Sequence, residues 1–282
     1  MSMTCRRLLS IQDISCLGQC SLTVALPILS AAGHETCILP SAVLSTHTGG
    51  FQGNTFRDLT EDMPLIAAHW LREKIRFDAI CTGYLGSAAQ IRHVLDIFRT
   101  LKGDPCVTFV DPAMADGGRL YRGFDMAFVK AMKELVLQAD IILPNITEAC
   151  LLTGETYRET CDPAFVHRLI RSLREQGAGT IVLTGVSYQE NRTGVMVLEG
   201  ETEFLYEHPL LPRLCHGTGD IFAAAFAGAC MRGIPVKDSA ILAADFTLRC
   251  VERTMNDPAH WYGVHFEAEL PRYIQSLAGS EN

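Results

Sequence analysis

The sequence predicts an α/β fold in which a mostly parallel central sheet is flanked by helices. One observation is that short β-branched or apolar runs alternate with longer segments of helical period along the chain. A second is that the pattern changes between about 185 and 210, where two alternating runs flank the turn residues 199–201. This second pattern is typical of an antiparallel hairpin, so we expect a small antiparallel β edge on the sheet.

Six short runs have the apolar, β-branched composition of buried strands. They are Leu8–Gln12, Thr36–Leu39, Ala79–Thr82, Cys106–Val110, Ile141–Leu143 and Thr180–Leu183. Eight longer segments have the periodicity of helices. They are Gln19–Ala32, Pro64–Lys74, Ala88–Leu101, Asp125–Ala139, Pro163–Gln176, Asp220–Met231, Lys237–Arg253 and Glu267–Leu277. Because the carboxyl ends of parallel strands share one edge of a sheet, we expect the ligand site in the loops at that edge.

We expect a single domain over residues 1–282. The chain contains no Pro/Ser-rich linker, no repeat of domain-building length and no low-complexity tract. With 48% hydrophobic and 20% charged residues, it can bury a sizeable core, which disfavours a disordered chain.

The charge balance argues against nucleic acid as a partner. Lys and Arg number 24 against 32 Asp and Glu, and the formal charge of −8 repels a phosphate backbone. The longest apolar stretch, Ile221–Met231, is far shorter than the roughly 18 residues of a membrane span, and no signal-peptide pattern follows Met1. The eleven cysteines form no CxxC pair, which favours reduced thiols. We therefore expect a cytoplasmic protein without membrane contact.

The most informative motif is His216-Gly217-Thr218-Gly219-Asp220, directly before an apolar helical segment. Glycines allow a sharp turn, and the free N–H groups in the first turn of a helix attract an anion. A carboxylate there suits phosphoryl transfer to an alcohol, since it can take the alcohol's proton while the amides stabilise the developing charge. The alternative is that Asp220 merely caps its own helix. The chain contains no GxxxxGK[ST] phosphate loop.

Carboxylates also follow two of the predicted strands. Asp111 comes directly after the strand that ends at Val110, and Asn145 and Glu148 follow the strand that ends at Leu143. Mg²⁺ prefers oxygen ligands and keeps several waters, so these carboxylates could hold it against nucleotide phosphates. Alternatively, each acid is a cap or a turn former, and the spacing from Asn145 to Glu148 matches a capping box.

Three further loops supply groups that suit a small polar aromatic ligand. Asp13, the pair His47-Thr48, and Tyr84 all lie shortly after predicted strands. An aromatic ring can be sandwiched by such a phenol and oriented by a few hydrogen bonds. Alternatively, His47 is a structural histidine and Tyr84 is a packing ring.

Together these segments resemble motifs of the pyridoxal kinases, within the ribokinase-like superfamily. The resemblance covers nearly the whole chain, in the order Ile11-Gln12, Ser45–Thr48, Thr82–Ser87, Asp111–Met114, Pro144–Glu148 and Gly217–Asp220. The Gly-Thr-Gly-Asp motif marks the superfamily broadly. The Gly-Tyr-Leu-Gly-Ser motif together with His-Thr is considerably more specific to vitamin B6 kinases.

The resemblance implies that a homodimer phosphorylates the 5′-hydroxymethyl group of pyridoxal, pyridoxamine or pyridoxine with ATP. It implies Asp220 as the general base and the amides of Gly217, Thr218 and Gly219 as the anion hole. The residues implied to face ATP and Mg²⁺ are Asp111, Asn145, Glu148, Thr184, Pro209 and Leu210, with Asp111 and Glu148 as the metal ligands. The residues implied to surround the pyridine ring are Asp13, His47, Thr48 and Tyr84. A monovalent cation such as K⁺ is a further implied cofactor.

Departures from the family pattern bear on the substrate. Many pyridoxal kinases have serine where this chain has Asp13, and the loop after it is shortened here to Ile14–Leu17. We hypothesise that Asp13 accepts a hydrogen bond from a protonated ring nitrogen or from the amine of pyridoxamine, which favours that vitamer. Hydroxymethylpyrimidine kinases of thiamine synthesis, which usually carry cysteine in place of Asp220, are one alternative. A non-catalytic regulator that binds nucleotide or vitamin B6 is another.

Overall fold

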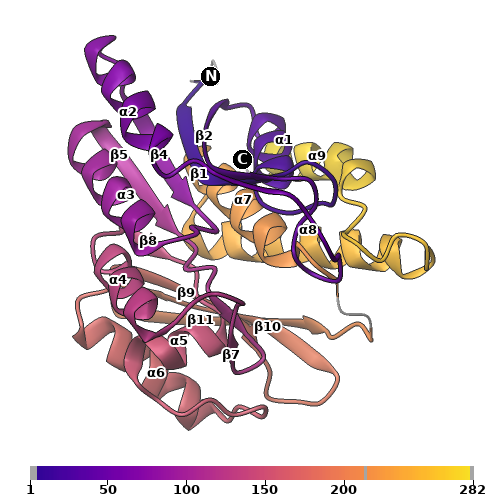
Figure 1. Cartoon of the computed structure of the whole chain (residues 1–282). Helices are drawn as coiled ribbons and strands as arrows, with labels where there is room; N and C mark the ends of the chain where they lie inside the picture. The colour runs from indigo at the N-terminus through magenta and orange to yellow at the C-terminus, as the bar shows by residue number, and fades with distance from the viewer. Residues whose placement is uncertain (1–4, 213–214, 280–282) are drawn as a thin grey trace.

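A nine-stranded, mostly parallel sheet forms the centre of the protein (Figure 1). The computed structural model describes residues 5–212 and 215–279. The strand order is β11-β10-β9-β8-β5-β4-β1-β2-β3. The strands are β1 (Arg7–Ser15), β2 (Glu35–Leu44), β3 (Phe56–Asp58), β4 (Phe77–Thr82), β5 (Lys102–Val110), β8 (Ile141–Ile142), β9 (Thr180–Val186), β10 (Arg192–Glu199) and β11 (Thr202–Pro209). Two short strands, β6 (Ala115–Asp116) and β7 (Arg119–Leu120), pair with each other in a separate small sheet.

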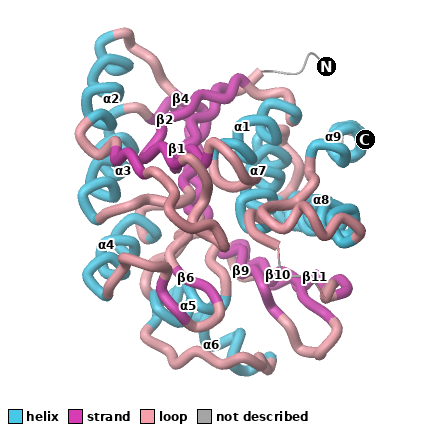
Figure 2. Tube along the Cα trace, turned by 45° about the vertical axis from the view of Figure 1, so that its right-hand side comes forward, coloured by secondary structure: helices cyan, strands magenta, loops and turns pink. Residues whose placement is uncertain are grey.

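Helices cover both faces of the sheet (Figure 2). They are α1 (Leu22–Ala31), α2 (Asp62–Arg72), α3 (Ala88–Thr100), α4 (Met126–Val136), α5 (Ile146–Thr153), α6 (Pro163–Glu175), α7 (Thr218–Met231), α8 (Val236–Met255) and α9 (Leu270–Gly279). Apolar side chains of α2–α6 form one core cluster, and those of α1 and α7–α9 form the other. Successive residues of a strand point to opposite faces, so Leu8 lies in one cluster and Leu9 in the other. This burial of both faces explains why the strands are continuously apolar.

The structure confirms the predicted fold class. Each of the six predicted strands overlaps one of the parallel strands β1, β2, β4, β5, β8 and β9, and only Leu143 lies beyond the end of its strand, β8. The predicted hairpin is β10 and β11, which pair antiparallel and extend the sheet beyond β9. The sequence pattern missed β3, whose three residues are all exposed, and the two-residue strands β6 and β7. Such short strands show no periodicity that could predict them.

The first helix begins three residues later than predicted. Gly18 and Ser21 have positive φ angles of 98° and 56°, so residues 18–21 form a loop and α1 begins at Leu22. This loop follows β1 directly and therefore lies at the carboxyl edge of the sheet. Among the described residues, no helix combines the length and the apolar composition that crossing a bilayer would need.

Candidate active site

The glycine turn before α7 leaves backbone amides open at the start of the helix. Gly217 is the N-cap residue with φ 84°, and the first intrahelical hydrogen bond runs from the Ile221 N–H to the Gly217 carbonyl, at 3.0 Å. The N–H groups of Thr218, Gly219 and Asp220 therefore have no intrahelical acceptor. A Cβ atom on Gly217 would lie 2.0 Å from the carbonyl oxygen of Gln19, so the turn packs directly on the loop before α1.

Asp220 does not cap its own helix, so that alternative is wrong. Among the residues that the structure describes, no side chain caps α7, and Oδ2 of Asp220 instead accepts a hydrogen bond from the backbone N–H of Ser21, at 2.9 Å. Burial raises the pKa of Asp220 to about 7, the negative charges of Asp111 and Asp13 add to the increase, and the Ser21 amide opposes it. A carboxyl group with such a pKa is suited to exchange a proton near neutral pH.

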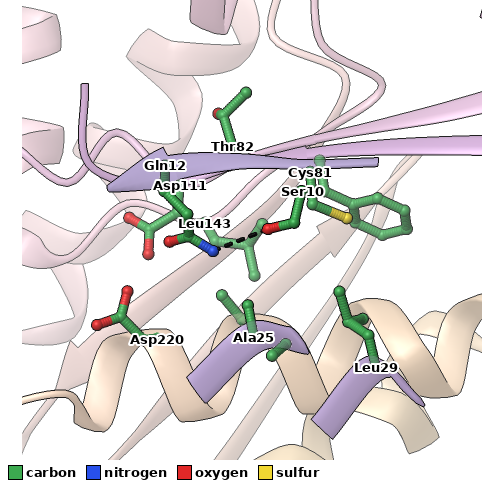
Figure 3. Close-up of a pocket in the computed structure, with 13 residues that line it drawn as sticks. Ser10, Gln12, Ala25, Leu29, Cys81, Thr82, Asp111, Leu143 and Asp220 are labelled. Carbon is green, nitrogen blue, oxygen red and sulfur yellow. Dashed lines mark hydrogen bonds between the residues drawn. The ribbon is translucent and has the colours of Figure 1, made fainter. Parts of the chain in front are cut away.

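Asp220 faces a cavity at the carboxyl ends of the central strands (Figure 3). The cavity is lined by side chains and backbone from β1, β4, β5, α1 and α7, and by residues that follow β4, β5 and β8. Figure 3 shows the carboxylates of Asp111 and Asp220 at the same end of this cavity. Gln12 lies on its wall and donates to Ser10 Oγ at 2.9 Å. None of the described residues that line the cavity is a lysine or an arginine.

Asp111 lies one residue beyond β5, as predicted. Its backbone N–H donates to the Thr82 carbonyl at 3.1 Å, and its Oδ1 accepts from the Ala113 N–H at 3.1 Å. Burial raises the pKa of Asp111, and the negative charge of Glu148 raises it further. The cavity lining therefore contains carboxylates, Asp111 and Asp220, but no cationic side chain among its described residues. Such a set of oxygen donors fits Mg²⁺, which would supply the missing positive charge.

Glu148 forms the capping box that its spacing predicted. Its Oε2 accepts from the N–H of Asn145 at 2.9 Å, while Asn145 Oδ1 accepts from the N–H of Glu148 at 2.9 Å. Its Oε1 accepts from the N–H groups of Met114, at 2.9 Å, and Ala115, at 3.4 Å. Glu148 is only 2% exposed, and burial raises its pKa. Both carboxylate oxygens already accept backbone hydrogen bonds, so water-mediated contact with a metal fits this residue better than direct ligation.

Two of the predicted ring contacts lie close together. Asp13 is buried and accepts a hydrogen bond from Ser15 Oγ at 3.0 Å, and burial raises its pKa. Burial also raises the pKa of Tyr84, and the charge of Asp13 adds to that effect. The ring of Tyr84 stacks on Phe124 with 5.5 Å between ring centroids, so the packing role considered for this ring is also present.

His47 is held on both ring nitrogens by the protein itself. The Gly49 N–H donates to Nδ1 at 3.0 Å, so Nε2 carries the proton and donates to the Tyr262 carbonyl at 2.6 Å. Burial lowers the pKa of His47. The structural alternative is therefore confirmed for this residue, and a ligand could contact only the face or carbon edge of the ring. Thr48 beside it is exposed.

The predicted nucleotide residues lie along the same edge of the sheet. The backbone N–H of Thr184 donates to the Pro144 carbonyl at 2.9 Å, which places Thr184 beside Asn145. Pro209 ends β11 opposite Arg192, at the edge where β9 also ends. Leu210 is 49% exposed.

The sequence pattern did not predict that the segment between α8 and α9 packs beside His47 and forms a wall of the candidate site. Trp261 and Tyr262 approach Phe51, with ring centroids 4.6 and 6.2 Å apart, and Phe51 approaches His47 at 5.0 Å. The side chain of Gln19 packs so closely on Gly263 that a Cβ there would lie 2.2 Å from Oε1. The adjacent aromatic residues Trp261 and Tyr262 in a polar segment were the one sign of this wall in the sequence. Packing between distant segments produces no periodicity along the chain that could predict it.

The chain is similar to known proteins over most of its length. A pyridoxal kinase named PdxY from Granulibacter bethesdensis is 31% identical over 78% of this chain and 79% of its own length. The family model described as phosphomethylpyrimidine kinase matches residues 31–264. The chain belongs to the pyridoxal kinase family.

Solved structures of this family have the same fold as the kinase described above. Pyridoxal kinase from Lactobacillus plantarum superimposes with a TM-score of 0.90 and 33% identity, over 96% of this chain and 98% of its own. A protein from Bacteroides thetaiotaomicron, assigned as a phosphomethylpyrimidine kinase and crystallised with pyridoxal, gives 0.91 and 35% over 96% of each chain. The ribokinase-like fold expected from the sequence is confirmed.

Proposed function

We propose that this kinase transfers the γ-phosphoryl group of ATP to the 5′-hydroxymethyl group of a B6 vitamer. The observation that carries the proposal is the carboxylate of Asp220, tethered by Ser21 beside the open amides of α7 and facing a cavity that Asp111 also lines. The pyridoxal in the Bacteroides structure supports this substrate class. The family resemblance extends the proposal to a single cytoplasmic kinase domain that works as a homodimer and uses a monovalent cation.

The reaction follows from the positions of these groups. Asp220 takes the proton of the attacking hydroxyl as the hydroxyl oxygen bonds to the γ-phosphorus, while the bond from that phosphorus to the β,γ-bridging oxygen breaks and ADP leaves. The helix N-terminus stabilises negative charge on the transferred group. Asp111, with Glu148 through water, would hold Mg²⁺, which neutralises charge on the phosphates when bound. Thr184, Pro209 and Leu210 would contact the nucleotide. No covalent intermediate with the protein is needed, because positioning and electrostatics supply the rate enhancement.

The pH profile should report Asp220. The group must be deprotonated to act as a base, so we expect kcat/KM to fall as the pH falls through about 7, which is its pKa in the free protein. Initial rates at saturating Mg-ATP in a constant-ionic-strength buffer series measure this limb. A profile that is flat between pH 8 and 5.5 would contradict the assigned base.

Asp13 is expected to select between vitamers. Asp13 is a buried carboxylate, and the described side chains that hydrogen-bond to it, Ser15 and Ser21, carry no positive charge, so the amine of pyridoxamine could supply one. For Asp13→Ser we expect the ratio of kcat/KM for pyridoxamine to that for pyridoxal to fall about tenfold or more, the magnitude of a hydrogen bond between charged groups. The control is Asp96→Ser, which removes an exposed carboxylate on α3. An unchanged ratio in Asp13→Ser would show that Asp13 does not contact the amine.

A substrate panel tests the proposed function against its alternatives. Hydroxymethylpyrimidine kinase is the second candidate, because the matching family model is described as phosphomethylpyrimidine kinase. Pyridoxal, pyridoxamine, pyridoxine and hydroxymethylpyrimidine would each be supplied with Mg-ATP, and ADP release followed by a coupled assay. The highest kcat/KM should belong to a B6 vitamer. If calorimetry detected binding of a vitamer and nucleotide but no ADP formed, the chain would be a regulator instead.

A further inference from the structure

A cluster of metal-ligating side chains lies outside the proposed active site. Asp257, His260 and His265 belong to the segment between α8 and α9, which is yellow-orange in Figure 1. One ligand atom from each of the three lies within 4.8 Å of the other two. His265 Nε2 is already 3.1 Å from Asp257 Oδ2, and the two imidazole rings stack with centroids 3.6 Å apart at 24°.

The hydrogen bonds around His260 fix its tautomer. Gln19 donates its Nε2 to Glu267 Oε1 at 3.0 Å, so its Oε1 is an acceptor. His260 Nε2 lies 2.8 Å from that oxygen and therefore carries a proton, which puts the lone pair on Nδ1. Metal-bound histidines almost always donate their other N–H to an oxygen acceptor in this way, because that bond orients the ring. His260 is 7% exposed, and Gln19, itself bonded to Glu267, orients its ring through Nε2.

We propose that Asp257, His260 and His265 bind a divalent transition metal of the zinc class. Two imidazoles and one carboxylate are ligands that Zn²⁺ prefers, whereas Mg²⁺ prefers oxygen ligands alone. Three protein ligands leave a fourth position for water in a tetrahedral site. Ligand atoms of such a site lie about 3.3 Å apart, as Zn–N bonds of about 2.0 Å require. The separation of His265 Nε2 and Asp257 Oδ2 already has this size, and the ligand atom of His260 lies within 4.8 Å of both, so metal binding would draw the three side chains closer together.

The position of the cluster links it to the wall of the active site. His260 contacts Gln19, whose carbonyl packs on Gly217, and Tyr262 accepts the hydrogen bond from His47. A metal bound here would fasten residues 257–265 to one another and so stabilise the wall that they form. The site itself depends on the fold alone, so it can be tested without substrate and does not rest on the proposed reaction.

Calorimetric titration of the intact protein with Zn²⁺, without nucleotide or vitamer, tests the proposal. We expect one Zn²⁺ per chain, bound at least about tenfold more weakly by His265→Ala and by Asp257→Asn. Zn²⁺ should also raise the Tm of the native chain and not that of His265→Ala, because a ligand that binds the folded state stabilises it. The matched control is His69→Ala, which removes an exposed histidine on α2 and should bind Zn²⁺ as the native chain does.

Cobalt spectroscopy separates this site from the eleven cysteines. Co²⁺ bound by imidazole and carboxylate should show d–d bands without a thiolate-to-metal charge-transfer band, and His265→Ala should lose those bands. Equal Zn²⁺ affinity in the native chain and His265→Ala would overturn the proposal. So would a Co²⁺ spectrum dominated by thiolate charge transfer, which would place the metal at cysteine. Unchanged Tm values of the metal-free variants would confirm that folding is not what changed.

Discussion

Replacing Asp220 with asparagine should lower kcat by roughly 100-fold or more while ATP binding changes little. A lost general base usually costs between about 100-fold and 10,000-fold. Asparagine keeps an oxygen that can accept the 2.9 Å hydrogen bond from the Ser21 N–H, so the helix start and the loop before α1 should keep their positions. The change therefore removes the proton acceptor and little else. Steady-state kinetics with the preferred vitamer and calorimetry with a non-hydrolysable ATP analogue would measure both effects.

The same variant should lose the acid limb of the pH profile. Since the limb near pH 7 is assigned to Asp220, the residual activity of Asp220→Asn should depend much less on pH between 6 and 8. The matched control is Asp116→Asn, which neutralises an exposed carboxylate of the small sheet and leaves the Asp220 hydrogen bond intact. Turnover of Asp220→Asn within a few-fold of the native rate would show that another group accepts the proton.

The sequence predicted the parallel strands because both faces of each are buried. A strand such as Ile181-Val182-Leu183 contributes to both core clusters, and this produces a short apolar run that is recognisable without any partner. The polar residues at the strand ends could be predicted for the same reason. Asp111 follows β5 immediately, so knowing where the strand ends was enough to place the carboxylate at the edge of the sheet.

Interactions between distant segments could not be predicted in this way. The hydrogen bond from the Ser21 N–H to Asp220 joins residues 199 positions apart. This bond showed that the Asp220 carboxylate does not cap its own helix and so favoured the role of a base. The bond from His47 to the Tyr262 carbonyl spans 215 positions and gave the imidazole a structural role. Neither contact produces a local pattern in the sequence, because the periodicity of each segment reflects only its own helix or strand. Glu148 is the opposite case, since its capping box spans three residues and its spacing predicted it.

Replacing Gly217 with alanine should reduce kcat/KM by roughly 100-fold, the size of effect that a displacement of about 1 Å at a catalytic group can produce. Two costs combine at this position. Its φ of 84° is unfavourable for any residue with a Cβ, and the new Cβ would lie 2.0 Å from the Gln19 carbonyl oxygen. The backbone on both sides of the contact must move apart. Because Ser21 N–H lies two residues from Gln19, the movement also disturbs the tether on Asp220.

Gly233→Ala separates these two costs. Gly233 lies just after α7 with φ 87°, and a Cβ there would meet nothing within 4 Å. Gly233→Ala should therefore show only the cost of the unfavourable φ angle. We expect its free energy of unfolding, measured by urea titration, to fall by about 1–2 kcal/mol while kcat/KM stays nearly unchanged. Gly217→Ala should lose more stability than this and most of its activity. If both variants lost stability equally and Gly217→Ala stayed active, the close approach of the two loops would not be what holds Asp220 in position.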